Sequence, residues 1–273
     1  MTNIFILVNP IFSVTERLLS RINQICTTQG IPFFIAGATA REILLHHVYN
    51  RSIGRRTRDI DIAVFVGDWS TFDALKNAFL AEGARAVQGN AHRMIAEGIE
   101  LDIIPFGDIA EDNQIAWPPD RAIIMAVDGF DEAFSHTVIV QLDNGEKLPF
   151  CSLPGLALLK LFAWRDRGHG NAKDATDLYK IICEYGAIED GRIYEAPVKG
   201  ERLGWEPVRM GAVLLGHDIA AISKAASLDE LTRLDKERLI DAVARQYDVG
   251  DTEKIEQVIN DFWMSFIPAS EST

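Results

Sequence analysis

The residues best suited to chemistry are two aspartates, Asp59 and Asp61, in the segment 58–66 (RDIDIAVFV). The β-branched and aromatic content of this segment predicts a strand. The two-residue period of a strand places both carboxylates on one face, opposite Ile60 and Ile62. Neighbouring positions on one face are about 7 Å apart along the backbone, close enough for two carboxylates to bind one cation. A solvated strand face is the competing interpretation of this pair taken alone.

A third aspartate strengthens the metal-binding interpretation. Asp102 lies between the apolar residues Leu101 and Ile103 in a second predicted strand, 99–106. Three carboxylates from two strands can hold two divalent ions, which act on the attacking and leaving oxygens in phosphoryl or nucleotidyl transfer. We therefore expect Asp59, Asp61 and Asp102 to be metal ligands and catalytic residues.

Groups that could bind phosphate precede the acidic strand. Gly37 ends a predicted strand, 32–36, and opens a helix whose free N–H groups could hold an anion, while Thr39 adds a hydroxyl. Ordinary turn chemistry is the competing interpretation of the glycine. A basic loop follows, and it could bind a triphosphate or acceptor phosphates or simply be solvated. Its four arginines are Arg51, Arg55, Arg56 and Arg58.

The remaining pattern predicts an α/β (α+β) protein of two domains. A helix over 13–29, begun by a capping box from Ser13 to Glu16, precedes the strand 32–36, and Ser70 with Asp73 starts a helix that ends at Gly83. Two hairpins are expected, 91–106 and 137–151. We expect a mixed-sheet domain over 1–152 and a mainly helical domain over 153–273.

Composition limits the possible classes of protein. Of the 273 residues, 48% are hydrophobic and 25% charged, which is typical of a globular protein. The net charge of −13 repels phosphate backbones and anionic bilayers, so a nucleic acid would need a local basic patch. No apolar run reaches the ~18 residues of a membrane span. The three isolated cysteines predict reduced thiols in a cytoplasmic protein.

Five motifs together carry a resemblance to a known family: AGATA (36–40), RTRDID (56–61), ELD (100–102), GLALLKLFAWRDR (155–167) and KDATDL (173–178). In these motifs the chain resembles the nucleotidyltransferase superfamily of DNA polymerase beta. It is more closely similar to the predicted bacterial nucleotidyltransferases related to AbiEii toxins.

The resemblance implies roles for individual residues. Asp59 and Asp61 would ligate two Mg²⁺ or Mn²⁺ ions, and Asp102 would aid deprotonation of the acceptor hydroxyl. The implied nucleotide-binding residues are Gly37, Thr39, Arg56, Arg58, Lys160, Asp174 and Asp177. Lys160 would contact the triphosphate, and Asp174 or Asp177 would support the nucleotide. In the competing interpretation, Lys160 and these two aspartates form structural ion pairs.

We expect an enzyme that transfers a nucleoside monophosphate from an NTP to a hydroxyl of RNA, protein or a small molecule and releases pyrophosphate. The expected partners are NTP, tRNA or another RNA bound by the Arg51–Arg58 loop, and an antitoxin if the chain is a toxin. One alternative is a non-catalytic nucleotide-binding or toxin–antitoxin interaction protein. Another is an antibiotic-modifying nucleotidyltransferase, which the acidic net charge favours, whereas the arginine loop favours RNA.

Overall fold

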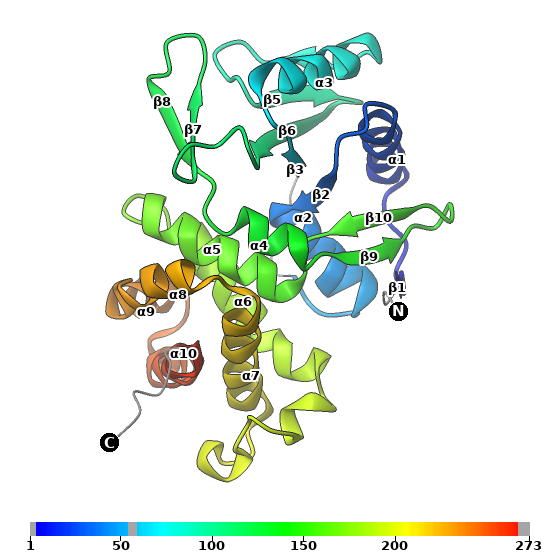
Figure 1. Cartoon of the computed structure of the whole chain (residues 1–273). Helices are drawn as coiled ribbons and strands as arrows, with labels where there is room; N and C mark the ends of the chain where they lie inside the picture. Colours follow the sequence, from blue (N-terminus) through cyan, green and yellow to red (C-terminus); the bar gives the residue numbers. More distant parts are fainter. Residues whose placement is uncertain (1–3, 54–58, 267–273) are drawn as a thin grey trace. The chain divides into compact units, whose positions relative to one another are not determined.

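A computed structural model describes residues 4–53 and 59–266 of the chain. The chain divides into two compact units, residues 1–152 and 153–273, which are described separately (Figure 1). Among the helices of the described residues, none combines the length and the apolar character that crossing a membrane requires.

The first unit is built on a mixed sheet with the strand order β1-β9-β10-β2-β3-β6-β5-β4, counted over the described residues. β3 runs antiparallel to β2 and parallel to β6, so parallel and antiparallel pairing meet at the centre. The expected α/β class is therefore confirmed. The strands of this sheet are β1 (Ile4–Ile6), β2 (Phe33–Ala36), β3 (Asp59–Phe65), β4 (Arg85–Ala86), β5 (Arg93–Ala96), β6 (Ile99–Phe106), β9 (Val138–Gln141) and β10 (Lys147–Phe150).

Helices and aromatic side chains complete the first unit. Phe34 of β2 packs against Phe106 of β6 and against Phe130 and Phe134 of the helix region α4, with ring centroids 5.7 to 6.4 Å apart. This cluster buries the central strands and so fixes the strands that carry the aspartates. The helices are α1 (Ser13–Thr28), α2 (Gly37–Glu42), the π-helix η1 (Ile43–Val48), α3 (Trp69–Ala81) and α4 (Phe130–Ser135).

Both expected helix starts differ in detail from the structure. Ser13 is the first residue of α1, and Phe12 at the N-cap makes no side-chain capping bond, so the predicted capping box is wrong. In α3 the cap is Asp68, whose carboxylate accepts a 2.7 Å hydrogen bond from the Thr71 N–H, and Ser70 lies inside the helix. The helix therefore begins before Ser70, with the free N–H of Thr71 satisfied by the aspartate that precedes it.

Both expected hairpins are confirmed, and several short elements were missed. β5 and β6 pair antiparallel around Glu97 and Gly98, which have φ values of 52° and 81°. β9 and β10 pair around Gly145, with φ 87°. The missed elements of the first unit are the strands β1 and β4, the short helix α4 and a separate hairpin of β7 (Gln114–Trp117) and β8 (Ile123–Ala126). The missed strands are two to four residues long, too short for a clear alternating pattern.

The second unit is helical within its described residues. α7 packs on both α6 and α10, and Gly186 of α6 meets Gly211 of α7 so closely that a Cβ on either would overlap the other helix backbone. Its elements are α5 (Leu153–Arg167), α6 (Lys173–Ile188), η2 (Arg192–Tyr194), η3 (Gly200–Leu203), α7 (Pro207–Ile222), α8 (Ala225–Thr232), α9 (Lys236–Ala244), η4 (Val249–Asp251) and α10 (Thr252–Phe266).

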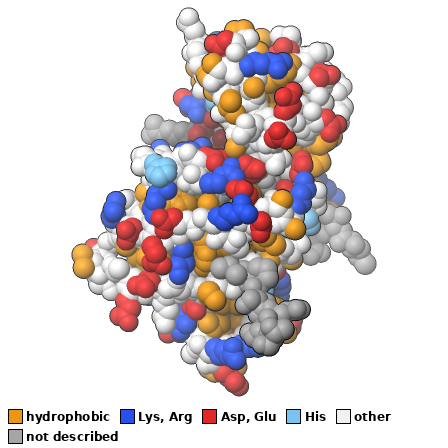
Figure 2. Space-filling model, turned by 60° about the vertical axis from the view of Figure 1, so that its left-hand side comes forward, with side chains coloured by type: hydrophobic (Ala, Val, Ile, Leu, Met, Phe, Trp, Pro, Cys, Tyr) orange, Lys and Arg blue, Asp and Glu red, His pale blue; other side chains and the backbone are white. Residues whose placement is uncertain are grey.

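The surface carries charges of both signs. Figure 2 shows acidic and basic side chains intermixed over the face that it draws, with hydrophobic side chains between them. The chain has a net charge of −13, but on this face the acidic side chains do not gather into one area.

Candidate functional site

Three carboxylates converge at the centre of the sheet. β3 and β6 pair in parallel with Asp61 directly beside Asp102, and Asp59 lies two residues earlier on the same face of β3. Each of the three side chains offers a carboxylate oxygen, and these oxygens all lie within 4.8 Å of one another. Asp102 is buried and the other two are half-buried. The structure therefore brings together the three aspartates that the sequence pattern singled out.

Arg93 holds the third carboxylate in place, and the sequence reasoning missed it. Its Nε donates a 2.7 Å hydrogen bond to Oδ1 of Asp102, and its Nη2 donates another of 2.7 Å to Oδ2. Its Nη1 donates a 2.6 Å hydrogen bond to Oε2 of Glu100. The signal was available, because Arg93 and Asp102 are equally distant from the Glu97-Gly98 turn and so pair directly across the hairpin.

The ion pair keeps Arg93 positively charged and orients the carboxylate of Asp102. Hydrogen bonding to Asp102 raises the pKa of Arg93 above its usual value, although burial acts in the opposite direction. A permanent cation beside three close carboxylates offsets part of their mutual repulsion. Both oxygens of Asp102 accept bonds from the guanidinium, which supports an orienting role of Arg93 toward this carboxylate. The expected role of Asp102 in deprotonation stays a prediction.

Gly37 is required by the close approach of an aspartate. Its φ is +59°, a left-handed conformation that favours glycine, and a Cβ built on it would overlap the carboxylate of Asp61. The glycine therefore lets the start of α2 lie against a metal-ligand candidate. The expected contact of Gly37 with NTP phosphates stays a prediction.

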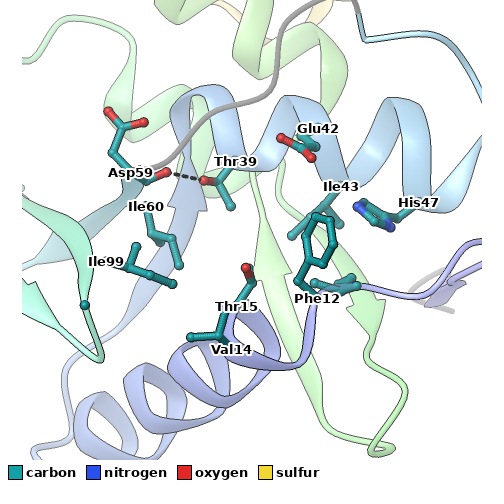
Figure 3. Close-up of a pocket in the computed structure, with 12 residues that line it drawn as sticks. Phe12, Val14, Thr15, Thr39, Glu42, Ile43, His47, Asp59, Ile60 and Ile99 are labelled. Atoms are coloured by element: carbon teal, nitrogen blue, oxygen red, sulfur yellow. Dashed lines mark hydrogen bonds between the residues drawn. The ribbon is translucent and has the colours of Figure 1, made fainter.

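Thr39 joins α2 to the acidic strand. Its hydroxyl donates a 2.6 Å hydrogen bond to the main-chain oxygen of Asp59, drawn as a dashed line in Figure 3, and the residue is buried. The bond uses the one proton that the hydroxyl can donate. This hydroxyl could donate to a phosphate only if the bond to Asp59 broke, so the contact supports a positioning role. The expected contact of Thr39 with NTP phosphates stays a prediction.

The basic loop is described only at its edges. Arg51 lies in the described part, and its main-chain N–H donates to the main-chain oxygen of Leu45 in η1. Arg55, Arg56 and Arg58 lie outside the described residues, so the nucleotide-binding role expected for Arg56 and Arg58 stays a prediction.

Lys160 has its counter-charges within the second unit. Its ammonium nitrogen lies 2.8 Å from an oxygen of Asp174 and 2.9 Å from an oxygen of Asp177, and Arg167 bonds Asp174 at 2.6 Å. Burial raises the pKa of Asp174, but the hydrogen bond from Arg167 and the charge of Lys160 outweigh it, so the pKa is lowered overall. These contacts are those of the structural alternative. A nucleotide role for Lys160, Asp174 and Asp177 stays a prediction.

The chain was also compared with known proteins. No protein-family model and no curated protein matches it. Among solved structures, ANT(2″)-Ia in complex with adenylyl-2″-tobramycin is similar at 12% identity over 80% of this chain and 99% of that one, with a TM-score of 0.42. An antigenic nucleotidyltransferase-like protein from Paracoccidioides brasiliensis is similar at 17% identity over 64% and 78%, also with a TM-score of 0.42.

A third similar structure is a tRNA nucleotidyltransferase complexed with a primer tRNA and an incoming ATP analogue. It shares 13% identity over 85% of this chain and 61% of that one, with a TM-score of 0.30. Likeness at this level assigns neither a family nor an activity. The function below is therefore argued from the residues of the site.

Proposed function

We propose that the chain is a metal-dependent nucleotidyltransferase centred on Asp59, Asp61 and Asp102. The observation that carries the proposal is the convergence of three carboxylates from two adjacent parallel strands, with their oxygens within 4.8 Å of one another. Like charges repel strongly at this separation. A site that gathers them is stabilised by a cation, and Arg93 bonds both oxygens of Asp102.

The donor set fits a hard divalent cation. Mg²⁺ and Mn²⁺ prefer carboxylate oxygens, and the cluster offers three while containing neither sulfur nor imidazole. Asp59 and Asp61 would hold one or two such ions together with Asp102. A bound ion would stabilise the charge that develops on the phosphoryl oxygens and favour the ionised form of an acceptor hydroxyl.

The reaction proposed is transfer of a nucleoside monophosphate. A bond forms between the acceptor oxygen and the α-phosphorus of an NTP, the bond from that phosphorus to the bridging oxygen breaks, and pyrophosphate leaves. The acceptor loses its proton to solvent or to a carboxylate of the cluster. In this chain Arg93 orients Asp102, Thr39 fixes the backbone at Asp59, and Gly37 gives Asp61 its space.

The nature of the acceptor rests on sequence motifs. The AbiEii-like motifs support action in the cytoplasm as a toxin that modifies a hydroxyl of RNA, including tRNA. The acidic net charge supports a small-molecule acceptor instead. One labelling experiment distinguishes an RNA acceptor from a small-molecule acceptor.

The purified chain should be incubated with Mg²⁺, a cell extract and each NTP radiolabelled at the α-phosphate, and the extract then separated into RNA, protein and small molecules. We expect one fraction to be labelled by the wild type and not by Asp61→Asn. The same NTP labelled at the γ-phosphate should leave the modified acceptor unlabelled, because the label leaves in pyrophosphate. Equal labelling by both phosphates, or by the variant, would contradict the proposal.

A further inference from the structure

The two edges of the sheet in the first unit differ in their protection. β4 ends the sheet at one side and begins with the exposed Arg85. Very short strands and charged side chains are devices that keep a sheet edge from pairing with another chain. β1 ends the sheet at the other side, where no strand of the described residues pairs with it except β9 (Figure 1). β1 is short as well, but it carries no charge.

The edge formed by β1 is exposed and apolar. The segment 4–12, which begins with β1, contains no charged side chain, in a chain of which 25% of the residues are charged. Ile4, Ile6 and Val8 lie at alternate positions and are 43%, 67% and 65% exposed. Exposed apolar side chains that lie together mark interaction surfaces, and an uncharged sheet edge is a template for another strand.

The apolar side chains continue from β1 across the next two strands. Ile4 pairs with Ile139 of β9, and Ile139 pairs with Pro149 of β10. Residues directly opposite each other in paired strands share one face of the sheet. Ile139 and Pro149 are half-buried, so this face is partly open. A strand added beside β1 would extend an apolar surface that already spans three strands.

β1 is fixed to the first unit before any partner binds. Besides its pairing with β9, Phe5 packs edge-on against Tyr49 with ring centroids 5.8 Å apart. Directly after the strand, the N–H groups of Val8 and Asn9 donate hydrogen bonds of 2.6 and 3.1 Å to the main-chain oxygen of His47. A strand that is already ordered loses little conformational entropy on pairing, which favours association.

Charge and symmetry favour a second copy of this chain as the occupant of the edge. Each copy has a net charge of −13, so two copies repel over most of their surfaces and approach best where charge is absent. Two identical strands can pair antiparallel about a twofold axis, which covers both edges with one contact and closes the assembly. A charged peptide would find no counter-charge in the segment 4–12.

We propose that two copies of this chain associate through antiparallel pairing of their β1 strands, which joins the two sheets into one. Ile4 and Ile6 of each copy contact the same residues of the other. The contact is small, so it belongs to the weak class of interfaces, with an expected Kd of about 1 to 100 µM. This inference does not depend on the proposed function.

Sedimentation velocity of the full chain measures the association over about 2 to 200 µM, which brackets the expected Kd. We expect the sedimentation coefficient to rise from that of a monomer toward that of a dimer. Ile6→Lys should raise the Kd at least about tenfold, because the contact would desolvate an ammonium. Ile124→Lys in β8 is the matched control, since Ile124 is 61% exposed and the charge change is the same, and it should associate as the wild type does.

A chain that stays monomeric over this range would overturn the proposal. An association that Ile124→Lys weakens and Ile6→Lys does not would place the contact at the β7–β8 hairpin and also overturn it. Because Ile6 is exposed, we expect Ile6→Lys to keep the circular dichroism spectrum and melting temperature of the wild type.

Hydrogen exchange of the wild type locates the contact without any variant. Amides of the segment 4–12 should exchange more slowly at high than at low protein concentration, because N–H groups at the edge become hydrogen-bonded in the dimer. Amides of the β7–β8 hairpin, residues 114–126, should exchange at the same rate at both concentrations. A dimer in which exchange of the segment 4–12 is unchanged would overturn the proposal, even if Ile6→Lys fails to fold.

Discussion

Replacing Lys160 by Met tests whether its ammonium is a structural ion-pair partner. The Asp174 and Asp177 side chains that it bonds are 2% and 9% exposed, and Lys160 itself is 12% exposed. Methionine keeps the length of the side chain and removes the charge. Breaking a buried ion pair costs about 3 to 5 kcal/mol, because a buried charge loses its partner. We expect about 3 kcal/mol, near the lower limit, since Arg167 still bonds Asp174.

The loss should depend on pH with a defined sign. The pKa of Asp174 is lowered in the folded state, so its stabilising contribution is present above the unfolded pKa of about 3.9 and is lost as pH falls through the folded pKa. Part of the lowering comes from Lys160. The difference in unfolding free energy between wild type and variant should therefore be full at pH 7 and shrink as the pH falls below the unfolded pKa of about 3.9.

Urea unfolding followed by circular dichroism measures this difference at pH 7 and in acid. Lys173→Met, at an exposed position on α6, is the matched control and should change stability by less than about 0.5 kcal/mol. A loss below about 1 kcal/mol for Lys160→Met at pH 7, or a loss that does not shrink in acid, would refute the structural assignment.

Three further outcomes are expected. Arg93→Met should weaken Mn²⁺ binding at least about tenfold and slow transfer, because the third carboxylate is no longer oriented; calorimetry and the labelling assay measure the two. Gly37→Ala should lower the free energy of unfolding by at least about 1 to 2 kcal/mol, through its left-handed φ and overlap with Asp61, and also weaken Mn²⁺ binding. Because burial raises the pKa of Cys26 to about 12 and that of Cys151 further, neither should react with Ellman's reagent near neutral pH until the chain is unfolded in urea.

Much of the fold was predictable because its signals are local. The alternation in β3, the Asn144-Gly145 turn and the helical periodicity of α1 each act within a few residues. Helix starts were less predictable, because several residues near a helix start can cap it and only geometry decides between them, as at Asp68 in α3. The short strands at the sheet edge carry too few residues to show a period.

The site was predictable where strand pairing alone determines it. Asp59, Asp61 and Asp102 lie in two strands, and parallel pairing is sufficient to bring them together. The roles of Gly37 and Thr39 were not predictable, because a carboxylate against the glycine and a hydroxyl donating to a main-chain oxygen are tertiary contacts.

The ion pairs of Lys160 show the same limit. A lysine among leucines signals an unusual environment, but the sequence does not state whether a nucleotide or a neighbouring helix supplies the counter-charge. In the structure α6 supplies two carboxylates, Asp174 and Asp177.

The central claim is that Asp59, Asp61 and Asp102 form one divalent-cation site, and a Mn²⁺ titration followed by electron paramagnetic resonance tests it most directly. We expect the wild type to bind Mn²⁺ saturably and Asp61→Asn to bind it at least about 100-fold more weakly, since loss of a supporting contact alone can reduce affinity 10- to 100-fold. Asp73→Asn, at an exposed position of α3, should bind as the wild type does. Asp61→Asn should melt at the same temperature or higher, because it removes like-charge repulsion. Equal Mn²⁺ affinity in the wild type and a folded Asp61→Asn variant would contradict the account.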